Sequence, residues 1–145
     1  MNESFSIQNL LDVALWLAGA GHFVLLLAGA QLPHRLDWKN DLAKLRPFNR
    51  KLLWTYWAFT GLTLVAFGTL TLVLHDELLA GNRAALALAV FICIFWAARI
   101  AVDGFYFSHR DWPSGRQFVI GHVLLTGLFT FLFCTYAGLF LWHAW

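Results

Sequence analysis

Long runs of apolar residues alternate along the chain with short polar segments. Four runs are present, approximately over residues 10–32, 52–74, 84–107 and 118–141. Each run exceeds the roughly 20 residues that an α-helix needs to cross about 30 Å of hydrocarbon. Because the connecting segments are short, consecutive helices should be antiparallel. The pattern predicts one all-α integral membrane domain over residues 1–145, a four-transmembrane-helix antiparallel bundle that runs up-down-up-down.

Residues that favour helix ends or turns separate the four runs. Pro33 closes the first run, the polar segment 75–77 closes the second, and the segment 111–115 forms a turn between the third and the fourth. In the polar segment after the first run, residues 39–44 are expected to form a short interfacial helix that is capped by Asp37.

The composition supports the membrane assignment. Hydrophobic residues make up 60% of the chain and charged residues only 12%, whereas soluble domains carry roughly 25% charged residues. This excludes a soluble globular protein, and the same hydrophobicity excludes intrinsic disorder. A net charge of +2 is too small to indicate a nucleic-acid partner. Cys93 and Cys134 lie inside apolar runs, as small buried hydrophobic residues do.

The basic residues predict the orientation of the bundle. Eight of the ten lie in the segments after the first and third runs: Arg35, Lys39, Lys44, Arg46, Arg50, Lys51, Arg110 and Arg116. Cytoplasmic loops carry an excess of Lys and Arg, so these segments should face the cytoplasm and both termini the non-cytoplasmic side. The first basic segment is also suited to contact anionic lipid, although its role in setting the topology is the explanation that we favour. We expect a bacterial inner membrane protein.

Small and polar residues mark the faces by which the helices should pack together. Such residues are enriched where membrane helices meet. The first run presents Ala18, Gly19, His22 and Gly29; the second Trp54, Gly61, Gly68 and His75; the fourth His122, Thr126, Thr130 and Cys134. Helix packing accounts for the glycines and threonines of these stripes. It does not account for the histidines.

Ionisable residues at membrane depth predict a functional cluster. At a rise of 1.5 Å per residue, the depths below the cytoplasmic boundary are about 15 Å for His22, 12 Å for Arg99, 7.5 Å for His122 and 6 Å for Asp103. Arg99 and Asp103 are four residues apart and can form an ion pair. Tyr106 lies on or beside the same helix face. The polar cluster is therefore expected in the cytoplasmic half.

One interpretation of this cluster is a haem b site for electron transfer. His22 and His122 would be the axial ligands, and Arg99 would bind a propionate. Gly21 and Gly121, which directly precede the histidines, would let the macrocycle approach the backbone. The two histidines differ in depth by about 7 Å, which helix tilt would have to absorb.

Two other interpretations use the same residues. The cluster of His22, Arg99, Asp103 and His122 could carry protons or a small polar solute through a homo-oligomeric channel or carrier, since histidine changes charge near neutral pH. The function that we expect is a non-catalytic subunit of a larger membrane complex, held together by this cluster and able to carry the haem b, with the channel or carrier as the alternative. No hydrolase, P-loop or dinucleotide motif is present in the sequence, which disfavours an enzyme. The expected partners are the bilayer, other membrane subunits or further copies of the chain.

A second group of ionisable residues lies at the non-cytoplasmic ends of the helices. His75, Glu77 and His143 are suitable ligands for zinc or copper. Histidines are also common at helix C-termini for electrostatic reasons alone.

Overall fold

Helices form over all four apolar runs. The computed structural model describes the backbone of residues 2–107 and 115–144, with side chains from Ile7 onward. The elements are α1 (Asn2–Arg35), α2 (Trp38–Asp41), the short 3-10 helix η1 (Leu42–Lys44), α3 (Pro47–Val73), α4 (His75–Leu79), α5 (Arg83–Phe105) and α6 (Arg116–Ala144). Of these, α1, α3, α5 and α6 are long and apolar enough to cross a membrane. The described residues contain no strand, so the predicted all-α chain with four apolar helices is confirmed.

Helix α1 does not end at Pro33 as predicted but continues to Arg35. Proline lacks an N–H, so the carbonyl of Gly29, four residues earlier, loses its usual helical donor. The indole Nε1 of Trp57 on α3 donates to this carbonyl at 3.4 Å instead. A neighbouring span thus compensates for the proline.

Two other predicted boundaries differ in detail. The segment 75–77 does not only close α3, because His75 begins the separate short helix α4 after a break at Leu74. Asp37 precedes α2 in a left-handed conformation and its side chain does not cap the helix; it accepts a hydrogen bond from Asn40 instead. The predicted turn at residues 111–115 lies, except for Gly115, outside the described residues.

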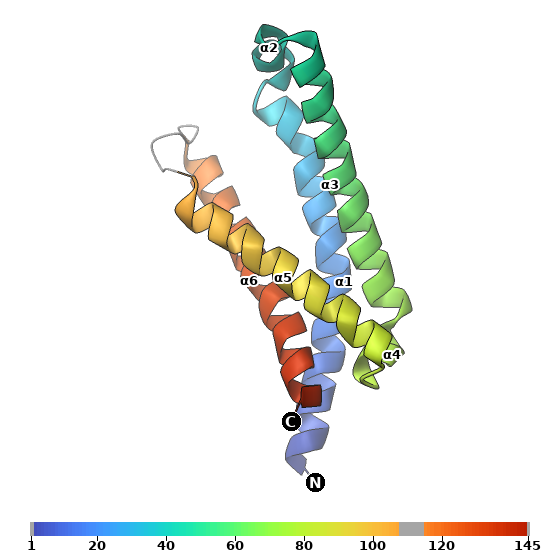
Figure 1. Ribbon diagram of the computed structural model, residues 1–145. Coiled ribbons are helices and arrows are strands. Elements are labelled where there is room, and N and C mark those ends of the chain that lie inside the picture. The colour runs from blue at the N-terminus through green and yellow to red at the C-terminus, as the bar shows by residue number, and fades with distance from the viewer. Residues whose placement is uncertain (1, 108–114, 145) are drawn as a thin grey trace.

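The four spans are arranged as two hairpins, α1 with α3 and α5 with α6 (Figure 1). Successive spans run in opposite directions, and both termini lie at the same end of the bundle. The hairpins cross near that end and diverge toward the ends that carry the α1–α3 and α5–α6 connections.

The buried core occupies only the half of the bundle nearest the termini. We call residues 7–25, 64–73, 83–96 and 129–144 the packed half, and residues 26–35, 47–63, 97–105 and 116–128 the open half. The packed half contains buried residues from every span, including Leu15, Phe67, Ile92 and Leu132. In the open half, none of the described residues is buried.

The glycine stripe of α1 meets that of α3 in the packed half. A Cβ added at Gly68 would lie 3.1 Å from the carbonyl oxygen of Gly19 and 2.7 Å from the ring of Phe23. A side chain at Gly68 would therefore push the two helices apart. The predicted role of Gly19 and Gly68 in close helix packing is confirmed.

Candidate functional site

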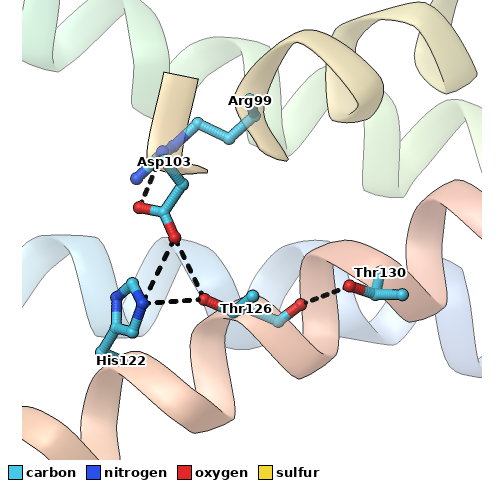
Figure 2. Close-up of polar contacts among 5 residues, drawn as sticks. All are labelled: Arg99, Asp103, His122, Thr126 and Thr130. Carbon is cyan, nitrogen blue, oxygen red and sulfur yellow. Dashed lines mark hydrogen bonds and ion pairs between the residues drawn. The ribbon is translucent and has the colours of Figure 1, made fainter. Parts of the chain in front are cut away.

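A cluster of ionisable and hydroxyl side chains joins α5 to α6 in the open half (Figure 2). Asp103 of α5 accepts from Arg99 Nη1 at 3.4 Å, one helical turn earlier on the same helix. Its other carboxylate oxygen lies 3.1 Å from the hydroxyl of Thr126 and 3.4 Å from Nε2 of His122, both on α6. The structure thus brings Arg99, Asp103 and His122 together, as the sequence predicts.

The hydrogen bonds in this cluster constrain where its protons lie. The Thr126 hydroxyl donates its proton to Asp103. His122 Nε2 lies 3.3 Å from the same hydroxyl oxygen, so Nε2 must carry the proton of that contact because the hydroxyl has only one to give. Thr130 donates to the backbone carbonyl of Thr126 at 2.8 Å. The Thr130 hydroxyl therefore bonds only within helix α6, and it does not extend the network of side-chain hydrogen bonds around Asp103.

The cluster is only partly covered. The Asp103 side chain is 11% exposed, whereas His122 is 30% and Arg99 38% exposed. The Arg99 guanidinium carbon lies 4.9 Å from the ring centre of Phe129, a cation–π contact. Phe129 in turn stacks on Trp96 at 5.1 Å. These aromatic rings form the boundary between the cluster and the packed half.

His22 occupies a different site, at the buried centre of the packed half. Its Nδ1 lies 2.7 Å from the Ala18 carbonyl oxygen, and its Nε2 accepts from the indole of Trp96 on α5 at 3.2 Å. A neutral imidazole with its proton on Nδ1 satisfies both bonds. Beside it, Thr71 of α3 and Tyr136 of α6 share a hydrogen bond of 2.6 Å. Each of the four spans thus contributes one side chain to this centre.

The structure does not bring His22 and His122 together. The His22 ring lies 6.1 Å from that of Tyr136, and Tyr136 is fourteen residues beyond His122, about 21 Å along α6. Both ring nitrogens of His22 are engaged in hydrogen bonds. The two imidazoles therefore lie in separate parts of the bundle, and Arg99 and His122 share Asp103.

Tyr106 is not part of the cluster either. It is 81% exposed at the end of α5, and its ring contacts Phe107. The sequence prediction put Tyr106 on or beside the helix face of Asp103 because it assumed that the helix continues past both residues. The helix ends at Phe105, so Tyr106 no longer follows that face.

The histidines near the termini have separate surroundings. His75 is buried against Trp16, and its Nε2 lies 3.1 Å from a carboxylate oxygen of Asp12 on α1. His143 instead packs against the turn at Gly81, and its Nε2 is buried without a hydrogen-bond partner in the described structure. Glu77 is exposed. Within the described residues, no three His, Cys, Asp or Glu side chains are placed to share a metal ion.

Sequence reasoning missed the partners of the buried histidines, although one signal was available. Trp96 is seven residues from Asp103, so its depth is about 16 Å, nearly that of His22. Equal depth on different helices could have indicated the His22–Trp96 bond. Nothing in the spacing identifies Asp12 as the partner of His75, because that contact depends on how α1 and α4 pack.

Comparisons of the chain with models of known protein families, with characterised proteins and with solved structures find no match.

Proposed function

We propose that this protein is a non-catalytic subunit of a larger membrane complex, and that a transmembrane helix of another chain packs between its two hairpins in the open half. One observation carries this proposal. Helix faces that are covered by the other spans in the packed half continue into the open half, where no other span of the described chain covers them. The next three features support it.

The inward faces of α1 and α6 carry uncovered glycines. Gly29 lies seven residues, two helical turns, beyond His22 on the α1 face that meets α5. Gly121 lies seven residues before Leu128, whose side chain contacts Gly21 of α1. No described atom lies within 4 Å of a Cβ placed at Gly29 or Gly121. Small residues allow membrane helices to approach closely, so these positions suit a helix from outside the chain.

The polar cluster faces the same region. Asp103 follows Trp96 by seven residues on α5, and Trp96 is directed at His22 of α1. Ionisable groups in membrane spans normally face a protein interior or water. His122 and Arg99 are partly exposed here, so a partner helix with polar side chains would cover their exposed surface.

The surface facing away from the core is suited to lipid. It carries large apolar side chains on both hairpins, such as Val24, Phe59 and Leu124. We further propose a bacterial inner membrane, with the basic connections in the cytoplasm and the termini outside. The gathering of Lys and Arg at one end supports this orientation. Reporter fusions at residue 145 and at residue 40 test this orientation.

The docking proposal is tested by placing a bulky side chain on one face of α6. Gly121→Leu fills the inward position. Gly127→Leu adds the same side chain to the same helix, also with no described atom within 4 Å, but about 120° around its circumference. Tagged variants are extracted from native membranes in a mild detergent and separated by native electrophoresis. We expect the wild type and Gly127→Leu in a complex above 16.5 kDa, and Gly121→Leu released from it.

Migration of the wild type as a lone chain would contradict the proposal, as would equal behaviour of the two variants. Co-expression of two differently tagged copies distinguishes a foreign partner from self-association. Recovery of both tags in one complex identifies the helix between the hairpins as a second copy of this chain.

The alternative function is a small homo-oligomeric channel or carrier for protons or a polar solute. The contact of Asp103 with both His122 and Thr126 favours it, because a carboxylate and an imidazole within 3.4 Å can exchange a proton. The chain would be reconstituted in vesicles that contain a pH-sensitive dye. Proton flux that is lost in Asp103→Asn and kept in Thr130→Val would support this function over docking, since Thr130 only bonds to its own helix.

A further inference from the structure

The segment that joins α1 to α3 carries a strong positive charge. Residues 34–51, all described, contain six basic and two acidic residues: Arg35, Lys39, Lys44, Arg46, Arg50 and Lys51, against Asp37 and Asp41. Asp41 forms an ion pair with Lys44 at 2.8 Å, and Asp37 accepts from Asn40 at 2.7 Å. Within the described chain, the other five basic side chains have no carboxylate within 4 Å. They remain available to an external anion.

Three tryptophans fix this end of the bundle at the level of lipid headgroups. Trp38 of α2 packs edge-on against Trp54 and Trp57 of α3, with ring centres 5.5 and 6.4 Å away. Trp54 and Trp57 also contact each other at 5.5 Å. Tryptophan is enriched at the membrane–water interface because its ring is apolar and its N–H is polar. The basic segment therefore lies beside phosphate groups.

A shallow pocket, open to the surroundings, lies along the last turns of α1 at this same end. It is lined by Ala30, Gln31, His34 and Arg35, which are all exposed and share one face of the helix. Arg35 donates from Nε to the side-chain oxygen of Gln31 at 3.1 Å. This bond orients the guanidinium along the pocket wall and leaves its two terminal nitrogens as donors, the fork geometry that binds phosphate.

We propose that this pocket binds the phosphodiester of an acidic phospholipid, with Arg35 as the principal contact. The exposed apolar side chain of Leu27 lies one helical turn before Gln31, on the same face of α1, where an acyl chain would run. The uncompensated charge of residues 34–51 favours an acidic headgroup over a zwitterionic one. This site is separate from the docking surface between the hairpins and does not depend on it.

The test measures lipid binding to the full chain in detergent. The purified protein is titrated with phosphatidylglycerol and, separately, with phosphatidylcholine, and retained lipid is counted by native mass spectrometry. We expect tighter retention of phosphatidylglycerol. Arg35→Gln should weaken it about tenfold, as expected for the loss of one charge-assisted hydrogen bond. Lys44→Gln removes the same charge from the same segment and should change the affinity by less than about twofold, because Lys44 is already paired with Asp41.

Several outcomes would overturn the proposal. Equal retention of the two lipids would remove the preference for an acidic headgroup. Equal losses in Arg35→Gln and Lys44→Gln would show that general charge, and not a site at Arg35, attracts the lipid. Competition by inorganic phosphate as strong as that by phosphatidylglycerol would identify a small-anion site. If Arg35→Gln cannot be purified, Arg35→Lys replaces it and should still bind more weakly than Lys44→Gln, because lysine lacks the guanidinium fork.

Discussion

The indole of Trp96 donates a hydrogen bond to His22 across the two hairpins, and the two residues are 74 positions apart in the sequence. Both side chains are fully or almost fully buried. A neutral imidazole with its proton on Nδ1 satisfies both this bond and the contact with the Ala18 carbonyl, so both ring nitrogens of His22 are engaged. Four predictions follow from this bond, its buried neighbours and the polar cluster.

Trp96→Phe should destabilise the bundle by about 1–2 kcal/mol, because the buried Nε2 of His22 loses its donor and the smaller ring leaves a void. The measurement is unfolding by SDS in mixed micelles. Trp54→Phe is the matched control, since it keeps an aromatic ring in the tryptophan group and breaks no bond between hairpins. An equal loss in both variants would show that the His22 bond contributes nothing.

Thr71 and Tyr136 should be energetically coupled through their 2.6 Å hydrogen bond. Thr71→Val and Tyr136→Phe each remove one hydroxyl of the pair and leave the other buried without this partner. Each single substitution should therefore be destabilising. The double substitution should cost less than the sum of the two, by about 0.6–1.7 kcal/mol, the range seen for hydrogen bonds between membrane helices. Strict additivity in a double-mutant cycle would rule out the interaction.

Arg99→Ala should destabilise the α5–α6 hairpin, because it leaves the largely buried carboxylate of Asp103 without its cation. The cost should be about 1–2 kcal/mol, below that of a fully buried pair, since Arg99 is partly exposed. Adding Asp103→Asn should restore stability by removing the uncompensated charge. Thermal unfolding in detergent compares the three proteins. No recovery in the double variant would contradict a pairing role.

The haem b prediction for His22 and His122 can be tested by the visible absorption of the purified protein, oxidised and then reduced with dithionite. Because this structure separates the two imidazoles, we expect no Soret band. A band that disappears in both His22→Ala and His122→Ala, and persists in His143→Ala, would instead establish the sequence prediction and a different packing of the hairpins.

The fold was accessible from the sequence because it depends on local properties. The length of each apolar run fixes the span, and short connections fix the antiparallel order. The glycines of α1 and α3 revealed their contact because close backbone approach requires small residues at matching depth. The ion pair of Arg99 and Asp103 followed from a four-residue spacing on one helix.

The grouping of His22 with His122 did not follow, because the rise per residue gives axial position only within one helix. It gives neither the offset of one helix along another nor the angle between the hairpins. His22 lies beside Tyr136, fourteen residues beyond His122 on α6, so the two histidines are offset along the bundle by more than their predicted depths allow. The contact of His75 with Asp12 was missed for a similar reason, because it depends on how α4 packs against α1 and not on spacing in the sequence.

The division into two hairpins also constrains the order in which the protein can assemble in the membrane. Each hairpin joins consecutive spans, so α1 and α3 can pair as soon as both have been inserted. The side chains that link the hairpins, Trp96 and Tyr136, belong to the last two spans to be synthesised. Until then, His22 and Thr71 are polar groups without these partners in the bilayer. An α1–α3 pair that lacks the second hairpin would therefore expose these polar side chains on the face that α5 and α6 cover in the complete bundle.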